Sequence, residues 1–406
     1  MVRHLALFIL LAVQQAQDPA AEGLKALDAG NHEAAIALFT KAVQADNSDY
    51  SAHFNLALAY SLAGRDAEAE ASYRKVLELK PGLVQAEINL ATVLLRQKKS
   101  REAVPLLEAA IQAKPGNPRA HLLLGDALLA AGDASKAEQA YHAALTADPK
   151  SAGAEIGLGR ALLRQSRLSE AEPHFRRAVE LDPSFRQALL QLGEAYEKAG
   201  KTDEAVAIYT QFPENAAARE RIGGLLLSAG RPKEAIPHFE WALQNAPTAA
   251  SRIALAQAYR QNGETEKALA MFRAAVDADP NATDLRMIYG RELRDARKFR
   301  EAAQQFYMVT QAKPGLVEAW SEFAAMLVSL ERFPQAIGAL NQIRDLGGET
   351  AGHVYLRAIV LDRIQDLKGA LAAYEHYLSL SQGLNPNEEF KARQRARIIN
   401  RELEKR

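Results

Sequence analysis

The sequence predicts an all-α fold, a right-handed superhelical α-solenoid of about eleven antiparallel helix pairs with a C-terminal capping helix. Two observations carry this prediction: small residues recur about every 34 residues along nearly the whole chain, and prolines follow the end of most of the repeats. The 406 residues are 48% hydrophobic and 25% charged, as is usual for a folded soluble chain. This composition excludes a wholly disordered chain and a multispanning membrane protein.

The period is clearest in a series of alanines, each of which follows a short polar turn: Ala35, Ala69, Ala103, Ala137, Ala171, Ala205, Ala235, Ala268, Ala302, Ala336 and Ala370. Twelve positions before each alanine lies a second small residue, from Gly23 to Ala358. Four positions after each lies a large apolar residue, from Phe39 to Tyr374. Small residues let two helices approach closely, and a large residue fills the space beside the crossing. Each repeat is therefore predicted to form two antiparallel helices.

Glycines and prolines mark the ends of the predicted helices. Glycine tolerates a positive φ, which suits the turn between two helices, and it stands there in six repeats, at Gly30, Gly64, Gly132, Gly200, Gly230 and Gly263. Proline cannot continue a helix, and it closes seven repeats, at Pro81, Pro115, Pro149, Pro183, Pro247, Pro280 and Pro314.

The fourth repeat shows all the marker positions together, occupied in order by His121, Leu124, Gly125, Leu128, Ala137, Tyr141, Ala144 and Pro149. This pattern resembles that of the tetratricopeptide repeat family, W-x2-L-G-x2-Y…A-x3-F…P with a period of 34 residues. The resemblance implies a solenoid over residues 17–384, with repeats near 16–49, 50–83, 84–117, 118–151, 152–185, 186–215, 216–248, 249–282, 283–316, 317–350 and 351–384.

Two repeats depart from the pattern. In the first, the leading helix is weak, and Asp18 and Pro19 are predicted to be its cap and its first residue. The sixth is four residues short, because residues 209–213 end its second helix early. Four residues are about one helical turn. The shortening is compatible with a hinge or with a tolerated loop deletion, and the sequence does not distinguish them.

Residues 385–406 are predicted to form a capping helix. Asn385 and Pro386 stand at the cap and first position, and Glu388 stands where a capping box would place it. An apolar stripe follows, made of Ala392, Ala396, Ile399 and Leu403, with Arg393, Arg395, Arg397 and Arg401 outside it. A repeat array needs such a terminal helix with a polar outer face. Because glutamates accompany the arginines, we expect this polar face to be solvated. The alternative is that the arginines bind an anionic partner.

Residues 1–16 are predicted to be a signal peptide. Arg3 precedes the apolar run Leu5–Val13, which is too short to span a bilayer. The expected cleavage point is after Ala16, although Gln14 stands two residues earlier, where signal peptides usually have a small residue. The alternative interpretation of this segment is a buried N-terminal helical turn. The chain is thus expected to be exported, to the periplasm or outside the cell. It has no cysteine, so it has no disulfide and is not a lipoprotein.

The charge balance and the scattered polar residues exclude several functions. Fifty basic residues cancel fifty acidic ones, which does not favour nucleic-acid binding. The nine histidines form no metal-binding spacing, and no phosphate-binding glycine loop is present. The sequence therefore predicts a non-enzymatic protein without cofactor, metal site or membrane span in the mature chain. Its oligomeric state is not predicted.

The resemblance implies that the first helix of each repeat lines a concave groove that binds a protein or peptide partner. The residues that it maps to this groove are Phe54, Asn55, Leu58, Ile88, Asn89, Leu95, Arg96, Leu122, Asp126, Arg160, Leu163 and Arg164. The expected function is a scaffold in a bacterial cell envelope that binds an extended peptide. The alternative is an accessory or substrate-recruiting subunit of an envelope enzyme or of a secretion or assembly complex.

Individual groove residues suggest how such a peptide is held. Asn55 and Asn89 stand where peptide-binding members of the family use asparagine to hold the main chain of a ligand, and an amide both donates and accepts. Arg96, Arg160 and Arg164 suit carboxylates of the ligand. The alternative for the groove leucines is that they pack between neighbouring first helices.

Overall fold

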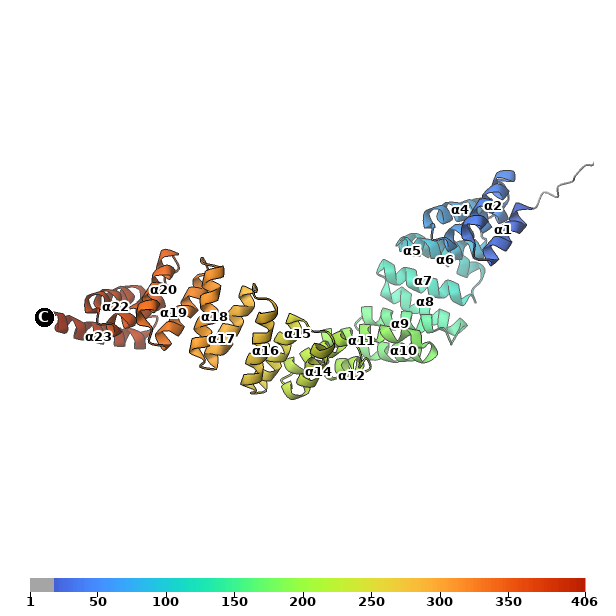
Figure 1. Cartoon of the computed structure of the whole chain (residues 1–406). Helices are drawn as coiled ribbons and strands as arrows, with labels where there is room; N and C mark the ends of the chain where they lie inside the picture. The colour runs from blue at the N-terminus through green and yellow to red at the C-terminus, as the bar shows by residue number, and fades with distance from the viewer. Residues whose placement is uncertain (1–17, 406) are drawn as a thin grey trace, which may run out of the picture. The chain divides into compact units, whose positions relative to one another are not determined.

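A computed structural model describes residues 18–405 of the chain (Figure 1). These residues form twenty-three α-helices, one short 3-10 helix and no strand, so the predicted all-α fold of antiparallel helix pairs is confirmed. The predicted signal peptide lies outside the described residues. No helix within the described range is long and apolar enough to cross a membrane.

The helices alternate along the chain as first and second members of eleven pairs. The first helices are α1 (Pro19–Asp28), α3 (Tyr50–Leu62), α5 (Val84–Arg96), α7 (Pro118–Ala131), α9 (Ala152–Arg164), α11 (Leu189–Lys198), α13 (Ala216–Ser228), α15 (Ala249–Gln261), α17 (Thr283–Asp295), α19 (Val317–Ser329) and α21 (Ala351–Arg363). The second helices are α2 (His32–Ala45), α4 (Asp66–Leu79), α6 (Ser100–Ala113), α8 (Ala134–Ala147), α10 (Leu168–Leu181), α12 (Thr202–Tyr209), α14 (Pro232–Asn245), α16 (Thr265–Ala278), α18 (Phe299–Ala312), α20 (Phe333–Asp345) and α22 (Leu367–Ser381). A 3-10 helix (Pro183–Ala188) precedes α11, and α23 (Pro386–Glu404) ends the described chain.

The chain divides into two compact units, one that ends at Ile208 and one that begins at Tyr209. The division falls in the sixth repeat, where α12 ends at Tyr209 after only 8 residues, whereas α10 has 14. The early end agrees with the sequence-based expectation for this helix. The hinge stays a prediction.

Each helix pair combines a small residue on the first helix with a large apolar residue on the second, which is a ring in nine repeats and a leucine, Leu107 or Leu340, in two. Tyr141 is fully buried, and a Cβ added to Gly125 would lie 2.5 Å from its ring. Gly23 is related in the same way to the ring of Phe39, at 2.6 Å. Because no real Cβ tolerates such a contact, these glycines allow a helix separation that a larger residue would prevent.

The turn between the two helices of a pair always places one residue at positive φ. Glycine takes this position in the six predicted repeats, from Gly30 to Gly263. In the other five the residue is not glycine, and its φ lies between 55° and 65°: Lys98, Ser166, Arg297, Glu331 and Gln365. The left-handed conformation is therefore a property of the turn and not of the residue that occupies it.

The C-terminal helix α23 packs on α22 through the predicted apolar stripe, in which Ala392 and Ile399 are fully buried. The predicted capping box is wrong. The side chain of Asn385 makes no cap hydrogen bond. Instead Glu389 accepts hydrogen bonds from the Gly383 amide and, at 2.7 Å, from the Ser381 hydroxyl. The carboxylate of Glu389, one position beyond Glu388, therefore binds donors of the turn that precedes α23.

Candidate functional site

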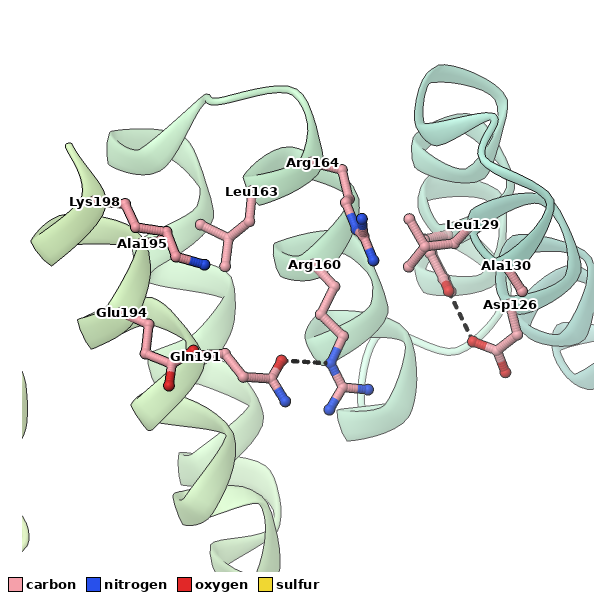
Figure 2. Close-up of a pocket in the computed structure, with 11 residues that line it drawn as sticks. Asp126, Leu129, Ala130, Arg160, Leu163, Arg164, Gln191, Glu194, Ala195 and Lys198 are labelled. Atoms are coloured by element: carbon pink, nitrogen blue, oxygen red, sulfur yellow. Dashed lines mark hydrogen bonds between the residues drawn. The ribbon is translucent and has the colours of Figure 1, made fainter. Parts of the chain in front are cut away.

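A cavity of about 730 Å³ lies on the first-helix face of the N-terminal compact unit, between α7, α9 and α11 (Figure 2). Its walls carry both apolar and charged side chains from three successive repeats. They comprise Asp126, Leu129, Ala130, Tyr141, Arg160, Leu163, Arg164, Gln191, Glu194, Ala195 and Lys198. A site that spans three repeats can contact several residues of an extended ligand.

The buried tyrosine beside the cavity has a different partner from the tyrosines of other repeats. In the second repeat, the hydroxyl of the buried Tyr73 accepts a hydrogen bond of 3.2 Å from Asn89, on the next first helix. In the sixth repeat, Tyr209 accepts one of 3.1 Å from Arg221 in the same way. The corresponding residue beyond Tyr141 is Gly157, which has no side chain to offer. The Tyr141 ring itself occupies the space beside Gly157, where an added Cβ would overlap the ring.

Tyr141 satisfies its hydroxyl in a different direction. It donates a hydrogen bond of 2.7 Å to Oδ1 of Asp126, on the first helix of its own repeat. Desolvation by the surrounding protein raises the pKa of the Asp126 carboxyl, although the Tyr141 hydrogen bond and the charge of Arg160 oppose the increase. Burial, and secondarily the charge of Asp126, raises the pKa of Tyr141. The tyrosine therefore stays protonated and acts as the donor.

Three cations surround the opening of the cavity. Figure 2 shows Arg160 between Gln191 and Asp126, and its Nε donates a hydrogen bond of 3.0 Å to the Gln191 side chain. Arg164 and Lys198 are exposed, and neither side chain has an ion pair or hydrogen bond within residues 18–405. The rim is thus rich in donors that a ligand can use, and the exposed Asp126 supplies an acceptor.

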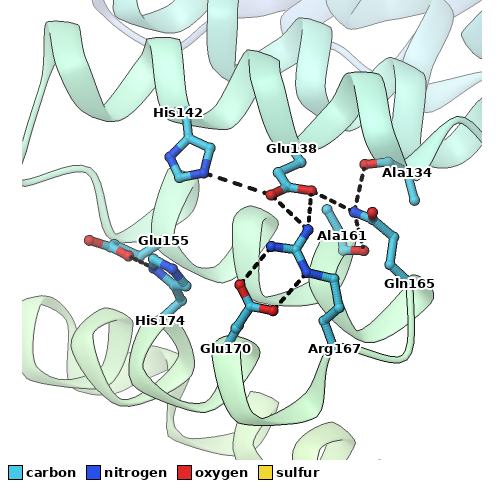
Figure 3. A network of polar contacts seen from close by, with 9 residues as sticks. All are labelled: Ala134, Glu138, His142, Glu155, Ala161, Gln165, Arg167, Glu170 and His174. Atoms are coloured by element: carbon cyan, nitrogen blue, oxygen red, sulfur yellow. Dashed lines mark hydrogen bonds and ion pairs between the residues drawn. The ribbon is translucent and has the colours of Figure 1, made fainter.

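The repeats that frame the cavity are joined by a polar network on α8 and α10 (Figure 3). Glu138 accepts hydrogen bonds of 2.9 and 2.8 Å from Nη1 of Arg167 and one of 2.7 Å from Gln165. Arg167 also donates to Glu170, at 2.8 and 2.6 Å. These bonds, led by the one from Gln165, lower the pKa of Glu138. The network fixes the fourth repeat against the fifth and so keeps the cavity in shape.

Four of the residues that the sequence assigns to the groove come together at this cavity: Asp126, Arg160, Leu163 and Arg164. The others are distributed over α3, α5 and α7 and do not line it. Asn55, Leu58, Leu95 and Leu122 are half-buried. Ile88 is different, because it is 1% exposed and belongs to the core with Ala110 and Ala120, so no ligand in a groove can reach it.

Other assigned residues already have partners. Asn89 accepts a hydrogen bond of 3.0 Å from Gln85 and donates to Tyr73. Phe54 packs edge-on against the Tyr73 ring, with centroids 5.7 Å apart. Nε of Arg96 donates to Asp66 at 3.0 Å, so its charge is balanced within the protein.

Sequence reasoning missed Tyr141, Gln191 and Lys198 as residues of the site. Tyr141 was assigned to the core, which is where its ring lies, while its hydroxyl faces the cavity. The available signal was Gly157, which stands where Asn55 and Asn89 stand in earlier repeats. Because Gly157 offers no side chain, the Tyr141 hydroxyl has no partner from the next first helix and bonds to Asp126. Within the described residues no cluster of three or more histidine, aspartate or glutamate side chains is arranged to bind a metal ion.

The stacked helix pairs and their marker residues define a helical repeat protein of the protein-interaction scaffold class. Two profiles described as tetratricopeptide repeat match the chain, one over residues 20–84, 88–152, 156–212 and 326–386 and the other over residues 226–291. The chain belongs to the tetratricopeptide repeat family.

Similar solved structures include MamA residues 41 to the end from Desulfovibrio magneticus RS-1, with 27% identity, a TM-score of 0.40 and coverage of 41% of this chain and 94% of that one. MamA AMB-1 is 26% identical, with a TM-score of 0.39 and coverage of 41% of this chain and 98% of its own. No curated protein sequence matches the chain significantly.

Proposed function

We propose that this protein is a non-catalytic scaffold that binds an extended segment of a partner protein along its first-helix face, with the cavity between α7, α9 and α11 as the main contact. The observation that carries the proposal is the cavity itself, which exposes polar and apolar side chains of three repeats to a single ligand. Tetratricopeptide repeats present this face to their partners.

The chemistry of the walls indicates which segment fits. Leu129 and Leu163 offer apolar contact to an aliphatic side chain. Arg164 and Lys198, which lack internal partners, suit carboxylates of the ligand. Asp126, which is exposed, accepts a main-chain or side-chain donor of the ligand. The preferred ligand is therefore an extended, mixed apolar and acidic segment.

We further propose that the chain acts in a bacterial cell envelope. The support is the N-terminal sequence, in which Arg3 precedes the apolar run Leu5–Val13. Comparing the N-terminal residue of the protein purified from its source with the encoded one tests this proposal, and an intact Met1 on an intracellular chain would contradict it.

The binding proposal is tested by reversing the two unpaired cations. The double variant Arg164→Glu, Lys198→Glu should lose partner proteins that the wild-type chain captures after crosslinking in its native host. Both side chains are exposed, so the helical circular dichroism signal and melting temperature should stay unchanged. A control variant on the second-helix face of the same repeats, Lys136→Glu with Arg177→Glu, should capture the partners normally.

Two outcomes would count against the proposal. Capture that is equal in the double variant and the wild type would exclude the cavity as the binding site. An enzymatic activity that co-purifies with the wild type and is lost with the double variant would instead support the accessory-subunit function. The cavity would remain the contact in that case, and the partner would be an enzyme.

A further inference from the structure

The C-terminal compact unit contains a second recessed surface, which is separate from the first-helix cavity and lies among α18, α19 and α20. It has a volume of about 350 Å³. Tyr307 and Phe323 form its aromatic wall, with ring centroids 5.5 Å apart, and Leu327 continues it. Tyr307 is 47% exposed, which is unusual for a ring that has an aromatic neighbour. We refer to this surface as the Tyr307 groove.

Tyr307 occupies a position that is polar in every other repeat. It directly follows the large apolar marker of the second helix, Phe306, and in the structure that position points away from the helix crossing. The corresponding residues are Thr40, Arg74, Glu108, His142, Arg176, Thr210, Glu240, Arg273, Asn341 and Glu375. Packing of the repeat therefore does not require an aromatic ring here. The ring adds exposed apolar surface, a feature that marks binding sites.

The charges beside the groove supply a second, independent observation. In three repeats, an arginine at the N-cap position of the second helix forms an ion pair with a glutamate three residues later. The pairs are Arg65 and Glu68, Arg167 and Glu170, and Arg231 and Glu234. The tenth repeat keeps the arginine, Arg332, but has Gln335 in place of the glutamate. The guanidinium group of Arg332 therefore has no internal carboxylate.

Arg300, in the first turn of α18, also lines the groove and is also without a partner. Neither arginine side chain forms an ion pair or hydrogen bond within residues 18–405, and no carboxylate lines the groove. Two unpaired arginines in the wall of an apolar recess favour an anionic ligand, because a guanidinium group binds carboxylate in a two-point geometry.

We propose that the Tyr307 groove binds a segment of a partner protein in which a bulky apolar side chain is flanked by carboxylates. The apolar side chain packs on Tyr307 and Phe323, and the carboxylates pair with Arg332 and Arg300. A recess suits an inserted side chain better than a lipid surface, which needs protruding apolar groups. The groove thus gives the scaffold a second docking site in its other compact unit.

The test uses fluorescein-labelled eleven-residue peptides and fluorescence anisotropy with the full chain. The set has a central Phe, Trp or Leu flanked by glutamates, with lysine-flanked and alanine-centred versions as controls. Measurements are made in the Arg164→Glu, Lys198→Glu background, because acidic peptides also suit the first cavity. The glutamate-flanked peptides with an apolar centre should bind, and both control sets should bind at least about tenfold more weakly.

The decisive variant is Gln335→Glu, which returns the internal partner of Arg332. It should weaken binding about tenfold, the effect of losing one charge-assisted hydrogen bond, while the melting temperature stays the same or increases. Tyr307→Thr, which introduces the residue found in the first and sixth repeats, should weaken binding as well. The control Arg231→Gln removes the arginine at the same position of the seventh repeat and should have no effect.

The proposal is overturned if Gln335→Glu binds as tightly as the parent chain, if lysine-flanked peptides bind equally, or if no peptide of the set binds at millimolar protein. It is also overturned if vesicles containing phosphatidylglycerol bind in place of the peptides and are released by the same variants. Since the first cavity is already disabled in every arm, failure here leaves the proposed function of that cavity untouched.

Discussion

At the scale of single residues, one position shows how the repeat satisfies its own backbone. In five repeats, the side chain of the fourth residue of the first helix donates a hydrogen bond to the carbonyl six residues earlier. The donors and acceptors are His53 and Asn47 (3.2 Å), His121 and Pro115 (2.7 Å), Arg219 and Pro213 (3.0 Å), Arg286 and Pro280 (3.1 Å), and Trp320 and Pro314 (2.8 Å). Chemically different side chains thus share one role. Glu87 occupies this position in the third repeat and, when ionised, has no proton to donate.

The carboxylate of Glu87 is therefore buried in an unfavourable environment. The residue is 7% exposed, its Oε2 has no hydrogen-bond partner, and desolvation raises its pKa. Glu87→Gln should therefore stabilise the protein at pH 7 by about 1 kcal/mol, because it removes the cost of burying a charge and offers a donor. Urea denaturation of the two proteins measures the difference.

The pH dependence of that difference has a definite sign. The folded pKa of Glu87 lies above the unfolded value near 4.3, so the penalty exists where the group is ionised in both states. As the pH falls through the raised folded pKa, the wild type takes up a proton and the penalty decreases. The two proteins should have similar stability below about pH 4. A gap that persists or widens in acid would refute this assignment.

At the scale of helices, the elements follow from periodicity together with local stop signals. Each second helix that precedes a marker proline ends two residues before it; α4, for example, ends at Leu79 and Pro81 follows. The pairing of helices depends on the buried alanines, since Ala137 in α8 is fully buried at the crossing with α7. These signals are local, which is why sequence reasoning found every pair.

Enlarging a crossing residue should be costly. Ala137→Leu adds side-chain volume at a crossing that has no free space for it. The variant should therefore be less stable by about 1–3 kcal/mol, measured as a lower melting temperature. Ala147→Leu, at the exposed end of the same helix, is the matched control and should have almost no effect. Equal melting curves for the two variants would show that Ala137 is not a packing contact.

At the scale of the whole molecule, each repeat contacts its neighbours and few others, so stability is a sum of local terms. The last repeat has a neighbour on one side only, and α23 covers its other side. This helix is also tied to α21, because Arg395 donates two hydrogen bonds of 2.7 Å to the carboxylate of Asp362. The cap therefore combines burial with a two-point ion pair.

Two adjacent isoleucines in α23 test this local coupling. Ile399 is fully buried and Ile398 is 45% exposed. Ile399→Ala should cost about 2–4 kcal/mol and should speed amide hydrogen exchange in α21 to α23. Exchange in α3 to α10 should not change, because those helices belong to the other compact unit. Ile398→Ala should leave both regions unchanged, and faster exchange throughout the chain would contradict the neighbour-only coupling.

The candidate site was only partly predictable. Asp126, Arg160, Leu163 and Arg164 were found because the repeat fixes which positions of a first helix face outward. Ile88 was assigned to the same face, yet it is buried in the core with Ala110 and Ala120. Burial at one position depends on how neighbouring side chains fit together, and a position within the period does not contain that information.

The sequence by itself determined the class of fold, the number of helix pairs and the places where they touch, because small residues, rings and prolines act over a few residues and recur in phase. Only the tertiary structure decided where the surface opens. A cavity depends on how the side chains of adjacent repeats meet: Asp126, Arg160 and Gln191 in one compact unit, and Tyr307 beside an unpaired Arg332 in the other. These arrangements become visible only when the neighbouring repeats are in place.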